Sequence, residues 1–193
     1  MNKKNHIVSI PELADQRGNS DAMGYHDDRT GTWKSLSWEK MADTCRRVGA
    51  ALLSLGLKDR ENVGIYSQNH PNWTLADLGI MFVSGVSVPI YATNTADQAD
   101  YIIREAGIRF LFVGDREQYE KALDLYARDD SPLEKLILFN KDVETQHEGT
   151  LYFDELLERV TDPLLEKAAS RAQEIDTDDL ATIIYTSGTT GEP

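Results

Sequence analysis

The sequence predicts an α/β fold, a mostly parallel sheet flanked by helices on both faces and preceded by a small N-terminal β-hairpin. Its strand-like segments are apolar on both faces, which is typical of strands in a parallel sheet covered on each side. They alternate with longer helix-like segments, an order that favours βαβ units. Neither an internal repeat nor a linker rich in Gly, Ser or Pro divides the 193 residues, so we expect one main core.

The hairpin is predicted over residues 23–38, MGYHDDRTGTWKSLSW. Short apolar or aromatic pieces flank Asp-Arg-Thr-Gly there, and Gly31 is expected in the turn. We divide the chain at this point into an N-terminal extension, 1–22, and an α/β subdomain, 23–193.

The first helix is predicted between Ser37, its expected N-cap, and Gly56, its expected C-terminal stop. Apolar residues recur there every three or four positions, which is typical of one face of an amphipathic helix: Met41, Cys45, Val48, Leu52 and Leu55. Because Cys45 lies on this stripe, we interpret it as buried packing rather than a reactive thiol. We expect the stripe to pack on the sheet rather than to contact a membrane.

Strands and helices alternate through the rest of the chain. Strands are predicted over 62–69, 87–91, 108–114, 133–140 and 181–188. Helices are predicted over 71–85, 96–107, 115–129, 152–160 and 163–173. Pro71 is expected to open the first of these helices, because proline is tolerated at the first helical position. Thr95 is expected to cap the second, and residues 140–150 are expected to form a loop.

Some conspicuous side chains are expected to have structural roles. Trp73 and Tyr91 are interpreted as core residues, although a place beside a substrate channel stays open for both. His70 is expected in a turn, and Asp178 and Asp179 in a solvated turn rather than at a metal. The spacing of the chain's four histidines does not suggest a metal site.

The net charge of −13 is unevenly distributed. Residues 115–179 carry 19 acidic side chains against 8 basic ones, a distribution that argues against nucleic acid or anionic lipid as the main partner. No stretch approaches the roughly 18 apolar residues that a membrane-spanning helix needs, and the first residues lack the apolar run of a signal peptide. With a single cysteine there is no intrachain disulfide, so we expect a cytoplasmic protein.

The last predicted strand runs into the loop TSGTTG, which has the chemistry of a phosphate cradle. Gly188 and Gly191 allow the backbone to approach a ligand closely, and consecutive amides that point the same way bind anions. The hydroxyls of Thr186, Ser187, Thr189 and Thr190 can donate to phosphate oxygens. Such a loop, at the carboxyl end of a parallel strand, lies where open α/β sheets bind ligands. The loop lacks the lysine of a Walker A motif. An ordinary Ser/Thr/Gly turn is the alternative on composition alone.

The order of residues in YTSGTTGEP resembles the signature loop of the AMP-forming adenylate ligases, which include acyl-CoA synthetases, luciferases and peptide-synthetase adenylation domains. Residues 185–191 and Pro193 match that loop position by position, whereas the Lys-Gly that follows it in the family is not in this sequence. The resemblance extends over roughly 23–193. Asn-x-Pro-x-Trp at 69–73 and VPIYAT at 88–93 are most similar to long-chain fatty acyl-CoA synthetases of the bacterial type.

This resemblance implies a reaction in which ATP and Mg²⁺ convert a fatty acid into an acyl-adenylate, and coenzyme A then forms a thioester. It implies that six residues clasp the ATP phosphates, with Thr186 also near Mg²⁺: Thr186, Ser187, Gly188, Thr189, Thr190 and Gly191. The family's other site residues lie downstream of these positions. We therefore expect an N-terminal piece of such a ligase, with no catalytic residue of its own and no ligase activity in isolation.

Other interpretations stay open. Within the superfamily, the substrate could be a short-chain, aromatic or amino acid. Outside it, the chain could be a non-catalytic binding or assembly module. A dinucleotide-binding domain is disfavoured, because no Gly-x-Gly-x-x-Gly follows the first strand. Peripheral membrane contact and homodimerisation are also left open.

Overall fold

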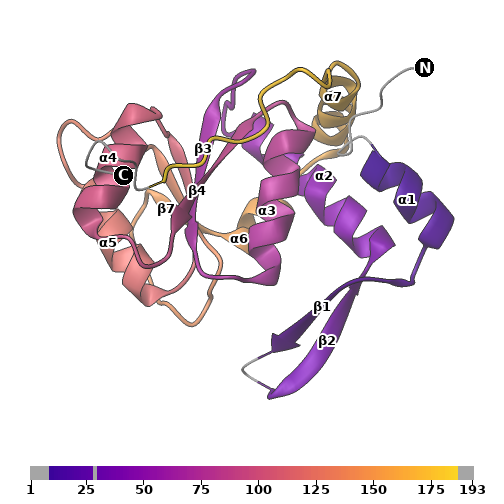
Figure 1. The fold of residues 1–193 in the computed structure, drawn as a ribbon, viewed down its shortest axis with the longest axis horizontal. Helices are drawn as coiled ribbons and strands as arrows, with labels where there is room; N and C mark the ends of the chain where they lie inside the picture. The colour runs from indigo at the N-terminus through magenta and orange to yellow at the C-terminus, as the bar shows by residue number, and fades with distance from the viewer. Residues whose placement is uncertain (1–8, 28–29, 187–193) are drawn as a thin grey trace.

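A computed structural model describes residues 9–27 and 30–186 (Figure 1). Its main sheet has five parallel strands in the order β4-β3-β5-β6-β7. The strands are β3 (Asn62–Ser67), β4 (Val86–Tyr91), β5 (Phe110–Val113), β6 (Lys135–Leu138) and β7 (Thr150–Tyr152). The chain passes from β3 outward to β4 and then crosses back over β3 to β5. This reversal is that of a doubly wound sheet. The parallel pairing of the strands is as the sequence predicts.

Helices cover both faces of the sheet, because alternate strand residues point to opposite sides. Val63, Ile65 and Phe112 belong to one hydrophobic cluster, and Tyr66, Leu111 and Val113 to the other. The first cluster packs under α2 (Trp38–Ser54), α3 (Pro71–Phe82), α6 (Phe153–Glu158) and α7 (Asp162–Gln173). The second packs under α4 (Ala96–Glu105) and α5 (Arg116–Tyr126). Figure 1 shows the two layers on either side of the sheet.

Helix α2 has the ends that the sequence predicts. The Ser37 hydroxyl accepts a hydrogen bond from the Lys40 amide at 3.2 Å, and Gly56 follows the helix with φ of +89°. Cys45 is 1% exposed, which confirms the interpretation as core packing. The rest of the predicted stripe is buried, except that Leu55 is only partly buried.

Helices α2 and α3 cross in close contact because glycines lie at the crossing. A Cβ atom on Gly79 would lie 2.5 Å from the Val48 Cβ atom and 2.9 Å from the Cys45 carbonyl oxygen. A Cβ on Gly49 would meet Val83 at 2.7 Å. The missing side chains therefore let the two helix backbones approach each other.

The predicted starts of the next two helices, at Pro71 and after Thr95, are also confirmed. His70 is the N-cap of α3, where its Nδ1 accepts from the Asn72 amide at 3.1 Å, and Pro71 follows at the first turn. Thr95 caps α4 in a capping box with Gln98.

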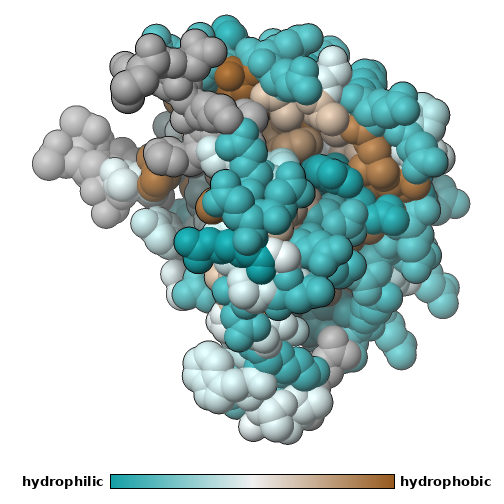
Figure 2. All heavy atoms as spheres, turned by 90° about the vertical axis from the view of Figure 1, so that its right-hand side faces the viewer, coloured by the Kyte–Doolittle hydropathy of each residue, from teal (hydrophilic) through white to brown (hydrophobic). Residues whose placement is uncertain are grey.

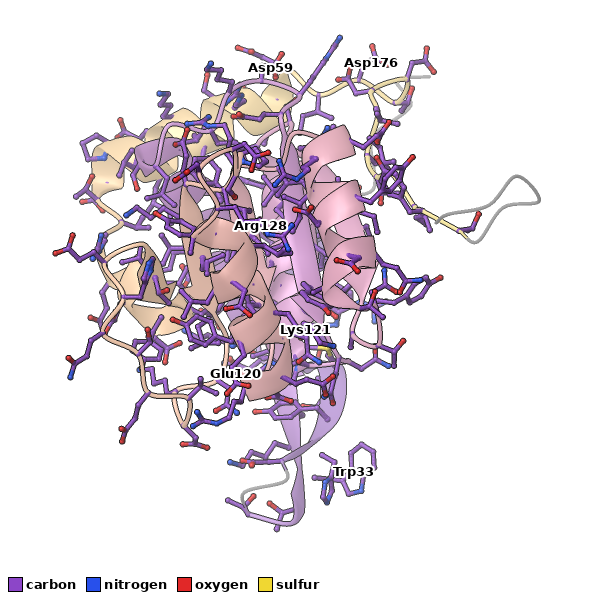
Figure 3. All side chains as sticks on the ribbon, turned by 90° about the vertical axis from the view of Figure 1, so that its left-hand side faces the viewer. Trp33, Asp59, Glu120, Lys121, Arg128 and Asp176 are labelled. Atoms are coloured by element: carbon purple, nitrogen blue, oxygen red, sulfur yellow. The ribbon has the colours of Figure 1, made fainter. Side chains whose placement is uncertain are left out.

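The hairpin consists of β1 (Asp21–Asp27) and β2 (Thr32–Ser37), paired antiparallel, with Gly31 at φ of +64°. It projects from the body of the molecule, and Trp33 near its tip is 77% exposed (Figure 3). Helix α1 (Ser9–Arg17) lies before the hairpin and buries Ile10. The division at residue 22 stays a prediction.

Three elements differ from the expectation. Helix α1 lies in the N-terminal extension, where no helix is predicted. Strand β7 lies at the end of the predicted loop 140–150, where the Leu136 amide donates to the Gly149 carbonyl at 2.9 Å. Three residues are too few for a periodic pattern, so the sequence does not reveal this strand. Conversely, the predicted last strand is not a strand within residues 181–186: it forms only an isolated bridge, Ser87 with Thr182.

Tyr91 is not a core residue, because the last position of β4 leaves its side chain 62% exposed. Trp73 is partly buried against the first cluster. The side of the molecule shown in Figure 2 is mostly hydrophilic, and its hydrophobic side chains gather in the upper half.

Candidate functional site

Residues 180–186, here called the edge segment, lie beside the main sheet and end at Thr186, the first residue of the predicted phosphate loop. The segment lies along the outer side of β4 and runs parallel to it. The Ser87 amide donates to the Ala181 carbonyl at 3.0 Å, and the Ile183 amide donates to the Ser87 carbonyl at 3.0 Å. The segment therefore starts at the amino end of the strands and leads toward their carboxyl end. Figure 3 shows it in yellow, passing α4.

An ion pair holds the beginning of the edge segment. Arg60 Nη2 donates to Asp179 Oδ1 at 2.5 Å, and Asp179 Oδ2 accepts from the Asp176 amide at 2.8 Å. The Asp179 side chain is only 16% exposed. The prediction of a solvated turn is therefore wrong for Asp179, because a guanidinium from a loop distant in sequence binds it. It holds for Asp178, which is exposed.

The end of the edge segment packs on α4. Ile183 and Tyr185 contact the second hydrophobic cluster, and the Tyr185 ring meets the Tyr101 ring edge-on with centroids 6.4 Å apart. Thr186 follows with an exposed side chain. Of the predicted phosphate-binding residues, five lie outside the described residues: Ser187, Gly188, Thr189, Thr190 and Gly191.

The loop after β4, residues 92–95, lies at the carboxyl end of this edge strand and is held by three side chains, two of which, Tyr66 and Gln118, are buried. The Tyr66 hydroxyl donates to the Asn94 carbonyl at 2.5 Å, and Lys121 Nζ donates to the same carbonyl at 3.2 Å. Gln118, which is 1% exposed, donates from Nε2 to the Ala92 carbonyl at 3.1 Å. Burial raises the pKa of Tyr66, so its hydroxyl stays protonated and can donate. Sequence reasoning missed these three side chains, because nothing in their spacing distinguishes them from ordinary strand and helix residues.

The described residues do not gather the side chains that usually bind a metal ion into one cluster. No cluster of three His, Cys, Asp or Glu side chains that could hold a metal occurs within 9–27 and 30–186. The exposed hydroxyl of Thr186 could serve as one oxygen ligand beside phosphate oxygens, an environment that suits Mg²⁺.

Two hollows in the surface lie away from the edge segment. One, of about 460 Å³, lies between α1 and α2, with Asp15, Glu39, Asp43 and Arg46 in its lining. The other, of about 400 Å³, lies between the hairpin and the start of α3, with Tyr25, His26, His70 and Trp73 in its lining. Among the described residues, no helix has the length and apolar character needed to cross a membrane.

Comparison with known proteins identifies the family. The model of the family described as AMP-binding enzyme matches residues 11–193. A long-chain-fatty-acid–CoA ligase, ACSBG2 of Xenopus laevis, is 31% identical over 192 residues, which cover 96% of this chain and 25% of that protein. The human ACSBG2 ligase is 29% identical over 98% of this chain and 26% of its own length. The chain thus spans about a quarter of the length of these curated relatives.

Solved structures share the fold. The anthranilate CoA ligase AuaEII, in complex with anthranoyl-AMP, matches 97% of this chain with a TM-score of 0.80 and 23% identity, over 33% of its own length. The inhibitor-bound N-terminal domain of FACL13 from Mycobacterium tuberculosis matches 98% of this chain with a TM-score of 0.76 and 22% identity, over 43% of its length. With its fold and its sequence match over residues 11–193, this chain belongs to the AMP-binding enzyme family.

Proposed function

We propose that this chain is the N-terminal part of an ATP-dependent long-chain fatty acid–CoA ligase. In such a reaction a fatty acid carboxylate attacks the α-phosphorus of ATP and releases pyrophosphate, and the thiol of coenzyme A then displaces AMP from the acyl-adenylate. The observation that carries the proposal is the edge segment, which directs Thr186 toward the carboxyl end of a parallel sheet. The names of the curated relatives support the choice of a long-chain acid.

We propose that the loop after Tyr185 binds the phosphates of ATP. Thr186, Ser187, Thr189 and Thr190 would donate hydroxyl hydrogen bonds, while the backbone at Gly188 and Gly191 would approach the phosphate oxygens. Donors that are fixed before the reaction stabilise the charge that develops on the leaving pyrophosphate. The contacts of Tyr185 and of residues 92–95 would keep this edge of the sheet in place.

The remaining functional assignments are proposals of the same kind. Thr186 would lie beside Mg²⁺, the metal that usually accompanies nucleotide phosphates. Coenzyme A and the fatty acid would bind to parts of the ligase beyond this chain, so residues 1–193 alone would form no acyl-CoA and would contain no catalytic residue. The single, buried cysteine favours a cytoplasmic protein. The names of the curated relatives favour a role in fatty acid metabolism.

Two alternatives remain testable. The fold is shared with an anthranilate ligase, so the acid could be aromatic, short-chain or an amino acid. A binding or assembly module without ligase chemistry is the second alternative.

The decisive experiment begins with the reading frame that encodes this chain, followed past residue 193. Its full protein is assayed for pyrophosphate release with ATP, Mg²⁺ and coenzyme A, using palmitate, benzoate or amino acids as the acid. We expect turnover with palmitate. Turnover with another acid alone would replace the substrate assignment, and a full protein that turns over none of these acids would favour the binding module.

A matched pair of threonine variants tests the loop. Thr186→Val removes a hydroxyl at the proposed phosphate site. Thr182→Val removes a hydroxyl near the start of the edge segment, where the backbone of Ser87 binds the backbone of Ala181 and Ile183. Loss of one donor to a transition state typically lowers kcat by roughly 10²-fold or more, so we expect such a loss for Thr186→Val. We expect little change for Thr182→Val. Equal activity of both variants would contradict a role for Thr186 at the phosphates.

A further inference from the structure

The edge segment pairs with β4 at one position and then leaves it. Ser87 makes both backbone bonds, to Ala181 and from Ile183. Within residues 9–27 and 30–186, no further backbone hydrogen bond joins residues 180–186 to β4. Something must therefore end the pairing after Ile183, although the residues that follow, Ile184 and Tyr185, are of types that favour strands.

Proline at position 89 accounts for this limit. Backbone groups of alternate strand residues point to the same side, so residue 89, two positions after Ser87, faces the edge segment, while Val88 faces β3. In a parallel ladder the next bond would run from the amide of residue 89 to the Ile183 carbonyl. Proline has no amide hydrogen and cannot form it, which is why proline in sheets is found on edge strands.

The released residues turn toward α4. Ile184 is 61% exposed, whereas the Tyr185 ring packs edge-on against Tyr101 of α4. In Figure 1 the chain approaches α4 at the end of the described residues. A longer ladder would instead hold residues 184–186 alongside β4, directed at the exposed end of that strand.

We propose that Pro89 is a positioning residue for the phosphate loop. By ending the ladder after one bridge, it releases residues 184–186 from the sheet edge, and the Tyr101–Tyr185 contact then sets where the loop begins. This inference deepens the proposed function and rests on it, since only a ligand-binding loop gives the exit direction a consequence. Pro89 itself would touch no ligand.

The experiment uses the 193-residue chain, labelled for NMR, as wild type and as Pro89→Val. Valine favours strands and supplies the missing amide hydrogen. We expect the new amide at position 89 to exchange with solvent at least about tenfold more slowly than an unprotected amide, because it binds the Ile183 carbonyl. We also expect the contact signals between the rings of Tyr101 and Tyr185 to weaken. A freely exchanging amide at position 89 with an unchanged ring contact would overturn the proposal.

Pro132→Val is the matched control, since it makes the same change in the loop before β6, and it should leave the ring contact intact. Pro89→Ala provides the same amide test should the valine variant not fold. A loss of the ring contact in Pro132→Val as well would overturn the assignment to Pro89, because the effect would then be general.

Titration with inorganic tripolyphosphate and Mg²⁺ separates the inference from the proposed function. In the wild type we expect the Thr186 amide signal to shift. We expect Pro89→Val to bind tripolyphosphate about tenfold more weakly than the wild type, and Pro132→Val to bind it as tightly as the wild type. If tripolyphosphate shifts no signal of residues 186–191 in the wild type, the phosphate-binding role is overturned. In that case a protected amide at position 89 of Pro89→Val would still support the inference that Pro89 ends the pairing with the edge segment. If that amide is protected but binding is unchanged, the positioning role is overturned.

Discussion

Arg60 and Asp179 lie 119 positions apart in the sequence, yet the guanidinium Nη2 of the first is 2.5 Å from the carboxylate Oδ1 of the second. Arg60 belongs to the loop before β3, and its amide also donates to the Ser84 carbonyl at 2.9 Å. Asp179 belongs to the turn that precedes the edge segment. The pair therefore joins the start of that segment to a loop at the amino end of the sheet.

We predict that Arg60→Ala loosens the edge segment with little loss of global stability. The Arg60 side chain is 66% exposed, and exposed ion pairs contribute up to about 1 kcal/mol to the free energy of unfolding. Hydrogen exchange of the Ile183 amide, which binds the Ser87 carbonyl, should nevertheless become faster. Arg116→Ala is the control, because it removes an exposed pair with Glu120 on α5. Unchanged exchange of Ile183 in Arg60→Ala would show that the pair does not hold the segment.

Gly79→Ala should destabilise the fold by about 1–3 kcal/mol, the usual effect of overpacking a core. The added methyl group would lie 2.5 Å from the Val48 Cβ atom and would force α2 and α3 apart. Gly24→Ala is a suitable control, since the nearest atom to its new methyl group is 4.0 Å away in the hairpin. Urea denaturation of both variants measures the difference. Equal midpoints would refute the close-crossing interpretation.

Cys45 should be unreactive toward alkylating reagents in the folded chain. Burial, together with the negative charge of Asp77, raises the pKa of its thiol to about 12, so almost no thiolate forms at pH 8. The same shift makes the free energy of unfolding depend on pH. The thiol loses its proton near pH 9 in the unfolded chain and near pH 12 in the folded chain. Its contribution to stability is therefore complete below pH 9 and is lost between pH 9 and about 12. Denaturation of the wild type and Cys45→Ala across this range should show the steeper decline in the wild type. Rapid labelling without denaturant would contradict the prediction.

Arg109 joins the residues that precede strands β3, β5 and β6, and the stability that it contributes through Glu134 should depend on pH. Its Nε and Nη2 both donate to the Glu134 carboxylate at 2.7 Å, and its Nη1 donates to Glu61 at 2.7 Å. These bonds lower the pKa of Glu134 below its usual 4.5. The resulting stabilisation is present above pH 4.5 and is lost as the pH falls through the folded value.

Glu134→Gln provides the measurement, by thermal unfolding between about pH 7 and about pH 3, a range that spans the titration of this carboxyl. We expect the variant to be less stable than the wild type at neutral pH and the difference to shrink in acid. Glu120→Gln on the exposed side of α5 is the control. A difference that stays constant with pH would argue that Glu134 contributes packing rather than a charge interaction.

The sequence predicts the layers of this fold well, because each depends on local signals. Residue type and spacing predict the apolar stripe of α2 and the helix caps at Ser37 and Thr95. They also account for the positive φ at Gly31 and Gly56. The loop motif similarly identifies the family. None of these features depends on a contact with residues distant in the sequence.

Three of the errors involve partners or positions that depend on residues distant in the sequence. Residues 181–186 have the composition of a strand, but whether they pair depends on Pro89 of the neighbouring strand. Asp179 looks solvated until Arg60 is placed beside it. Tyr91 looks like a core residue, and its exposure depends on its place at the end of the edge strand β4. Local sequence patterns carry no information about these contacts.

The edge segment also has a consequence for the order of folding. Helix α7, which precedes it, packs on one face of the sheet, while Ile183 and Tyr185 pack on the other, so the chain passes around the rim of the sheet. It can dock only after β4 and α4 are in place, and its Arg60–Asp179 contact closes a loop of 119 residues. Because closing long loops is entropically costly, we expect this segment to be among the last parts to become protected during refolding. The loop proposed to bind phosphate would then be presented only by molecules whose two layers are already assembled.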